Sequence, residues 1–233
     1  MHSPLDPAYL TPTKIIDSDH PLVGEYAQEI LQQHSSDPVA IATALYYKVR
    51  DGIFYNPYVA YHREESYQAS NVIKRKKGYC VSKAALLCAL GRYCGIPSRV
   101  GFSTVRNHIA TKQLIDLIGT NEFAYHGYTE FYLNEKWIVA TPAFDKKTCE
   151  RHGVAPLEFN GENDSKYQTF NADKGQFLEY LVDHGSYADI PVNQIITEFR
   201  RKYGDELVQK WIDAFDSMRG IANRRFDQEE VVS

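Results

Sequence analysis

The chain has 233 residues, of which 43% are apolar when Tyr and Cys are included, and its net charge is -4 with both signs well mixed. A chain of this size can bury one substantial core, so we predict a single domain over residues 1–233. The mixed charge gives no electrostatic reason to expect nucleic acid or an anionic membrane as a partner. No apolar run approaches the roughly 20 residues needed to span a bilayer.

The start of the chain and its cysteines indicate a reducing compartment. Residues 1–7 lack the basic segment and following apolar stretch of a secretory signal. The four cysteines, at positions 80, 88, 94 and 149, do not resemble a disulfide framework in a chain of this length. We therefore expect a cytoplasmic protein with reduced thiols.

Helices dominate the first part of the chain. Residues 1–20 are irregular in pattern, and apolar residues then recur at helical spacing. Asp37 offers an N-cap and Pro38 suits the first helical position. The predicted helices cover residues 22–33, Pro38 to about Gly52, and 69–74.

The next elements predict an antiparallel sheet. A helix over Cys80–Tyr93 is the clearest element of the sequence, with Gly95 and Pro97 after it as stop signals. Strands are predicted over 98–105, 122–133 and 136–140, the last two joined by a turn at Asn134-Glu135. Residues 107–121 are polar and ambiguous.

Two more helices are predicted in the tail. One covers about 191–203 and stops at Gly204; the other carries an apolar stripe of Leu207, Trp211, Phe215 and Met218. Helices, an antiparallel sheet and further helices together indicate the α+β class. We expect a core over 37–150 and a helical C-terminal extension over 185–233.

Cys80 is the candidate nucleophile. It lies at the mouth of its predicted helix, where free backbone N–H groups and the macrodipole favour a thiolate. Cys88 and Cys94 lie within and at the end of the helix, among apolar neighbours, as structural cysteines do. They would be roughly 12 and 21 Å from Cys80 along the axis at 1.5 Å per residue, so we expect no metal site and no cofactor.

His126 is the candidate partner of Cys80. It begins a predicted strand and precedes Gly127, which lets another backbone or a substrate approach closely. A nearby imidazole would complete an activated thiol nucleophile. If the hairpin turns as predicted, a residue that orients the imidazole comes from the end of the partner strand. Thr141 and Asp145 are the candidates there.

These motifs together resemble the transglutaminase-like superfamily, in particular a bacterial branch of it. The resemblance covers roughly residues 37–150. It rests on three ordered motifs: Gly78-Tyr79-Cys80 before an Ala/Leu-rich helix, Gly95-Ile96-Pro97-Ser98-Arg99-Val100, and His126-Gly127-Tyr128 with the later Ala140-Thr141-Pro142.

The resemblance implies a papain-like core, in which the Cys80 helix packs on an antiparallel sheet that carries the histidine. It also implies a Cys-His-Asp triad, to which Cys80 and His126 correspond. The family's usual Asp-Pro pair is Thr141-Pro142 in this chain. The third member is therefore open between Thr141, Asp145 and Asp164.

The expected chemistry is acyl transfer on amide bonds of a protein or peptide substrate. Cys80 would form a thioester, with its own N–H and a second donor such as Tyr79 stabilising the oxyanion, and His126 would act as general acid and base. Hydrolysis by a peptidase or amidase is slightly favoured over transfer to an amine.

The alternative is a weak or inactive scaffold of the same fold that binds a protein partner. In that case Thr141 in place of the family's Asp would reflect a loss of catalytic activity. The apolar stripe of the tail, which includes Trp211, would then be the contact surface for the partner or a homo-oligomer interface. That stripe has a simpler interpretation as a cap on the core. Arg99 is interpreted as a structural ion-pairing residue, and most tyrosines between 46 and 67 as ordinary core and surface residues.

Overall fold

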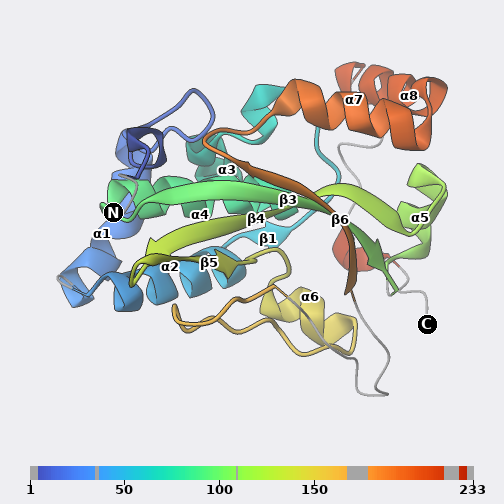
Figure 1. Ribbon diagram of the computed structural model, residues 1–233. Helices are drawn as coiled ribbons and strands as arrows, with labels where there is room; N and C mark the ends of the chain where they lie inside the picture. The colour runs from blue at the N-terminus through green and yellow to red at the C-terminus, as the bar shows by residue number, and fades with distance from the viewer. Residues whose placement is uncertain (1–4, 35–36, 109, 167–177, 218–225, 230–233) are drawn as a thin grey trace.

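The computed structural model describes residues 5–34, 37–108, 110–166, 178–217 and 226–229 (Figure 1). The α-helices of these residues are α1 Pro21–Gln33, α2 Pro38–Gly52, α3 Ala69–Arg75, α4 Cys80–Tyr93, α5 Lys112–Ile118, α6 Lys146–Arg151, α7 Val192–Tyr203 and α8 Asp205–Asp216. The strands are β1 Phe54–Tyr55, β2 Lys77–Gly78, β3 Ser98–Asn107, β4 Glu122–Leu133, β5 Lys136–Ala140 and β6 Leu178–Tyr187. Among the described helices, none is long and apolar enough to cross a membrane.

The central sheet has the strand order β5-β4-β3-β6, and each neighbouring pair is antiparallel. The predicted α+β class is therefore confirmed. The β4–β5 hairpin also forms where expected: Asn134 and Glu135 both adopt positive φ angles, 49° and 65°, as a tight two-residue turn between twisted strands requires.

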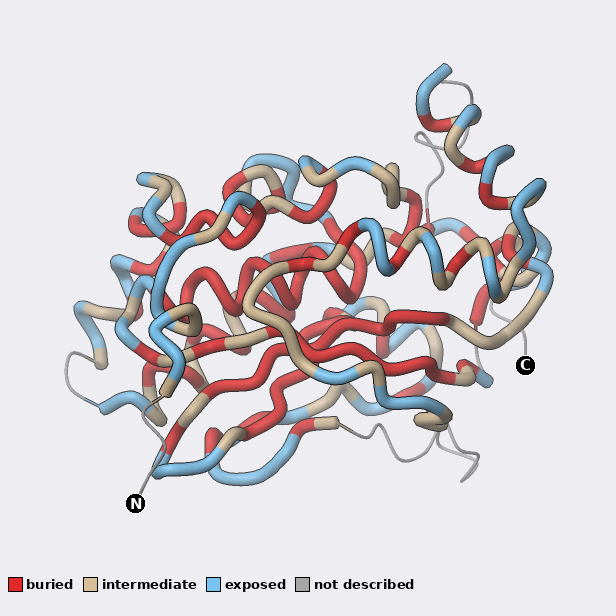
Figure 2. Tube along the Cα trace, turned by 45° about the horizontal axis from the view of Figure 1, so that its top comes forward, coloured by how far each residue is buried: buried red, intermediate tan, exposed pale blue. Residues whose placement is uncertain are grey.

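Helix α4 is the centre of the core. Every residue from Cys80 to Arg92 is buried, because α4 packs on β3 and β4 while α1, α2 and α3 cover its other sides (Figure 2). A helix buried all round needs no polar face, which explains its continuous Ala/Leu composition. Ser82, Lys83 and Arg92 are its buried polar residues, and the Lys83 ammonium donates to the carbonyls of Arg50 and Ile53 at the end of α2, over 2.8 and 2.7 Å.

The helices α5 and α6, the two-residue strands β1 and β2, and strand β6 were not predicted. Strand β6 is an edge strand whose residues are mostly half-exposed or exposed, so its sequence lacks a clear alternation. Residues 185–187 of the expected helical extension belong to β6, and its helices begin at Val192. Helix α7 packs on β4 and α8 packs on α7, while Met218 of the predicted stripe lies outside the described residues.

Candidate active site

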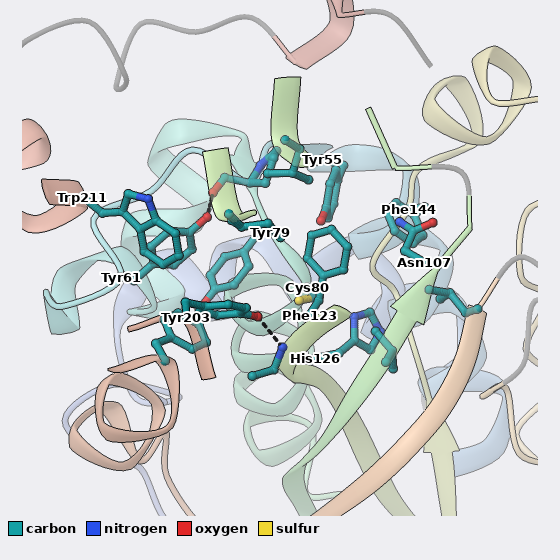
Figure 3. Close-up of a pocket in the computed structure, with 17 residues that line it drawn as sticks. Tyr55, Tyr61, Tyr79, Cys80, Asn107, Phe123, His126, Phe144, Tyr203 and Trp211 are labelled. Carbon is teal, nitrogen blue, oxygen red and sulfur yellow. Dashed lines mark hydrogen bonds between the residues drawn. The ribbon is translucent and has the colours of Figure 1, made fainter. Parts of the chain in front are cut away.

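Cys80 and His126 line the same cavity, of about 60 Å³ (Figure 3). Both are nearly enclosed, with 7% and 5% of their surfaces exposed. The rest of the wall is mainly aromatic, and its rings are Tyr55, Tyr61, Tyr79, Phe123, Phe144, Phe199, Tyr203 and Trp211. The fold thus brings together the two residues that the sequence predicted as a pair.

The start of α4 is fixed against β4. The Tyr79 N–H donates to the Ser82 hydroxyl over 3.1 Å, which closes the first turn of the helix. A Cβ atom on Gly127 would lie 2.8 Å from the Cα of Val81, so no larger residue fits there without a shift. The prediction that Gly127 allows a close backbone approach is confirmed, and this approach sets Cys80 beside the strand that carries His126.

An irregularity in β4 positions His126. Tyr125 has a left-handed φ of 53°, and the β3–β4 register shifts between Ser103 and Val105. Such bulges bend a strand and redirect the side chains next to them. The Tyr125 ring stacks on His184 of β6 at 4.4 Å between centroids, which holds the bulged residue in place. His126 follows immediately and is aimed into the cavity (Figure 3).

Burial controls the protonation of Cys80. Removal from water raises the pKa of its thiol to about 11, although backbone N–H groups of Gly127, Val81 and Cys80 itself act in the opposite direction. Burial therefore opposes the thiolate that the helix start was expected to favour. With this pKa the Cys80 side chain is a thiol at neutral pH.

His126 is also uncharged at rest. Burial and, to a smaller extent, the nearby Lys166 ammonium lower the pKa of its imidazole to about 4. Lys166 lies over the rings of Tyr128 and Tyr180, at 4.9 and 5.0 Å, and the Tyr180 ring is 6.3 Å from that of His126. Sequence reasoning missed Lys166, because nothing local links it to a histidine forty residues away. A neutral imidazole can accept the thiol proton.

Thr141 lies just beyond β5, at the position the resemblance assigns to the third member. Its N–H donates to Ser165 over 3.2 Å, and its carbonyl accepts from the Tyr46 hydroxyl over 3.1 Å. Within the described residues, its own hydroxyl and the Nε2 atom of His126 are both buried without a hydrogen-bond partner. Buried polar atoms of this kind are rare and mark places where a water, a ligand or a conformational change completes the structure.

The two aspartates have other partners. Asp145 caps α6: its carboxylate accepts from the N–H and hydroxyl of Thr148 and, over 2.8 Å, from the N–H of Tyr55. Asp164 is exposed and accepts from the N–H of Val139 over 2.8 Å. Among the described residues, therefore, no carboxylate is bonded to His126.

Side chains of the C-terminal helices α7 and α8 form one wall of the cavity. The Tyr203 hydroxyl of α7 accepts from the N–H of Ala124 over 2.7 Å, the dashed line of Figure 3. The Trp211 indole of α8 donates to the carbonyl of Leu117 over 3.2 Å. Trp211 and Phe215 are buried and pack on Tyr61. Trp211 and Phe215 of the predicted stripe are thus buried within the chain, and Trp211 lines the Cys80 cavity.

Arg99 has the structural role expected of it. It forms an ion pair with Glu130 at 2.8 Å on the neighbouring strand and lies 4.1 Å from the Trp137 ring. Across the described part of the chain, no cluster of three or more His, Cys, Asp or Glu residues could hold a metal ion.

Comparison with known proteins identifies the family. The family model of the transglutaminase-like superfamily matches residues 24–142, slightly more than half of the chain. Among solved structures, a candidate cysteine protease from Cytophaga hutchinsonii is similar, with 14% sequence identity and a TM-score of 0.41. The match covers 77% of this chain and 53% of that protein, so the chain spans about half of its length. No curated protein gives a significant match. The chain belongs to the transglutaminase-like superfamily.

Proposed function

We propose that this protein is a thiol enzyme that cleaves or transfers amide acyl groups of a protein or peptide, with Cys80 as nucleophile and His126 as general acid and base. One observation carries the proposal: the only thiol at a helix start in the described chain lines the same pocket as a neutral imidazole. Membership of the family supports it. The other cysteines lie away from this cavity wall.

The neutral pair defines the order of steps. His126 accepts the proton of the Cys80 thiol as the sulfur attacks the carbonyl carbon, so charge appears only as the reaction begins. The carbonyl oxygen becomes an oxyanion, for which the Cys80 N–H at the start of α4 is a donor. The tetrahedral intermediate collapses as His126 protonates the leaving amine, and a thioester remains. Attack by water or an amine, deprotonated by His126, releases the product and the thiol.

Hydrolysis is the favoured outcome. The cavity beside the thiol, of about 60 Å³, is large enough to admit water, which is the abundant acceptor for the thioester. We therefore propose a peptidase or amidase, and transfer to an amine is the competing result that an assay must measure.

Thr141 is the proposed orienting residue, although its hydroxyl is not bonded to His126 at rest. A hydroxyl would stabilise imidazolium less than a carboxylate does, so we expect a modest turnover. Asp145 is no longer proposed for this role, because its carboxylate is used by Tyr55 and Thr148.

A peptide library with a fluorescent amine donor tests the reaction. The library is incubated with the wild type, Cys80→Ala and His126→Ala, and mass spectrometry counts cleaved, deamidated and amine-bearing peptides. Each substitution should lower product formation on the order of 10³-fold or more. Cys94→Ala, at the opposite end of α4, is the matched control and should keep full activity. Unchanged turnover in either test variant would contradict the proposal.

A second candidate, a scaffold that binds a protein partner without turnover, is favoured by the unbonded His126 and the Thr at position 141. It predicts no product from any library. It also predicts that Cys80→Ala leaves binding of the partner unchanged.

A further inference from the structure

Residues Phe226–Gln228 form a short 3-10 turn between α5 and α6 (Figure 1). The next residue, Glu229, is buried. One carboxylate oxygen of Glu229 accepts from the Tyr58 hydroxyl, and the other accepts from the Thr111 hydroxyl over 2.7 Å. Tyr58 and Thr111 are themselves buried and come from different parts of the chain. A carboxylate is costly to bury and needs donors that match its oxygens. These two hydroxyls therefore form a built carboxylate site.

The same surface also holds Phe226. We call the residues that hold Phe226 to Glu229 the seat; they are Tyr55, Tyr58, Thr111, Arg151 and His152. The Phe226 ring packs on Tyr55 at 5.2 Å and stacks on His152 at 5.9 Å, with an interplanar angle of 17°. The Arg151 guanidinium donates to the Phe226 carbonyl over 2.6 Å. The seat thus contacts a ring, a backbone carbonyl and a carboxylate, which are features of a peptide.

This seat continues the Cys80 cavity. A smaller cavity of about 10 Å³ is lined by the Phe226 ring and lies beside the larger one. Both cavities are lined by Tyr55, Asn107, Leu114 and Phe144. Tyr55 thus contacts the Phe226 ring and also lines the cavity that holds the thiol.

We propose that this seat is a substrate subsite of the Cys80 centre. It recognises a peptide that carries an aromatic residue and, three positions later, a carboxylate, and in the resting protein Phe226 to Glu229 occupy it. The inference rests on the proposed function, since it names the class of peptide that reaches the thiol. The resting occupant also supports the wall of the Cys80 cavity, because the Phe226 ring packs on Tyr55, which lines that cavity.

The segment is suited to exchange. Phe226 belongs to a small apolar cluster with Tyr58 and Leu114, separate from the main core. Segments held by few buried apolar contacts open at lower free energy than the global unfolding of a protein. A peptide with the same features can therefore replace it without unfolding the sheet.

A binding experiment tests the subsite independently of catalysis. The protein carries Cys80→Ala, which removes turnover, together with Phe226→Ala and Glu229→Gln, which vacate the seat. The probe is a fluorescent peptide with the sequence of residues 223–233, read by anisotropy. The probe should bind the triple variant at least about tenfold more tightly than it binds Cys80→Ala with Phe226 and Glu229 unchanged. Adding Tyr58→Phe to the triple variant should weaken binding of the probe about tenfold, because one hydrogen bond to the carboxylate is lost. A probe carrying the same Ala and Gln substitutions should not bind.

A second measurement uses Cys80 as the reporter. With Cys80 present, vacating the seat should raise the iodoacetamide alkylation rate of this thiol about tenfold, and the unlabelled peptide should reverse the increase. Glu229→Gln alone, which keeps the Phe226 ring, gives the same direction if the double variant is unstable. A folded variant that neither binds the probe nor changes in alkylation rate would overturn the subsite. Turnover that survives Cys80→Ala would instead overturn the proposed function and leave the binding result standing.

Discussion

At Cys80 two physical effects oppose each other, and their sizes decide the outcome. A helix N-terminus stabilises a nearby anion by about 0.3–1 kcal/mol. Enclosure by aromatic rings raises the pKa from its ordinary 9.0 to about 11, a larger effect in the opposite direction. In the proposed mechanism the thiol therefore reacts only as His126 takes its proton during attack on a bound substrate, which would limit side reactions at rest.

Lys166 should control the pKa of His126. Its ammonium destabilises imidazolium, so Lys166→Met should raise the His126 pKa from about 4 toward the ordinary 6.5. Imidazole NMR titration of the two proteins measures the shift. Lys112→Met, at an exposed residue that pairs with Asp116, is the control and should leave His126 unchanged. A His126 pKa that does not rise in Lys166→Met would show that burial alone sets it.

Lys83 should make stability depend on pH. Burial lowers its pKa to about 7 from 10.5, although Asp145 and Asp51 act to raise it. Between these two values the unfolded chain binds more protons than the native one, so stability rises from pH 7 to about 10.5 and is flat below 7. Relative to Lys83→Met, the wild type should gain on the order of 3–5 kcal/mol over this interval.

Urea unfolding of both proteins at pH 6, 8 and 10 measures this difference. At pH 10 the neutral amine still has two N–H groups for the carbonyls of Arg50 and Ile53, which Met leaves unpaired. The wild type should therefore be the more stable protein at pH 10. A difference that is constant with pH would mean that Lys83 is charged in the native protein throughout.

At the scale of elements, the contact between α4 and β4 decides the site. Gly127→Ala should lower the free energy of unfolding by about 1–3 kcal/mol, because its methyl group would meet the Val81 Cα rather than a movable side chain. Urea unfolding measures the loss, and adding Val81→Ala should not restore it. In Gly52→Ala the methyl meets only the Tyr26 hydroxyl, so a loss as large as that of Gly127→Ala would refute this explanation.

The elements that were predicted correctly are those whose ends are set by residues close in the sequence. The Cys80 helix has its stop signals within a few residues, and the β4–β5 hairpin has its turn between its strands. Strand β6 was missed because its half-exposed residues do not alternate, and its pairing with β3 joins residues about eighty positions apart. Asp145 was misjudged for a related reason: its partner Tyr55 is ninety residues away.

At the scale of the whole molecule, the family core and the later segments have different roles. Residues 24–142 match the family and contain both Cys80 and His126. Helices α7 and α8 form one wall of the Cys80 cavity, and Leu178 of β6 also lines it; all three elements lie outside that match. The proposed chemistry therefore belongs to the family core, and we expect access to it to depend on the later segments that line the cavity.

Trp211 allows this division to be tested. Trp211→Ala should cost about 3–5 kcal/mol of stability. It should also raise the alkylation rate of Cys80, because the indole lines the cavity and holds α8 to Leu117. Val208→Ala is the matched control: Val208 is buried in the same helix but does not line the cavity. Its substitution should lower stability without changing the alkylation rate under native conditions. Equal rates in the two variants would show that α8 affects Cys80 only through global stability, whereas a faster rate in Trp211→Ala alone identifies this helix as the part of the fold that admits substrate.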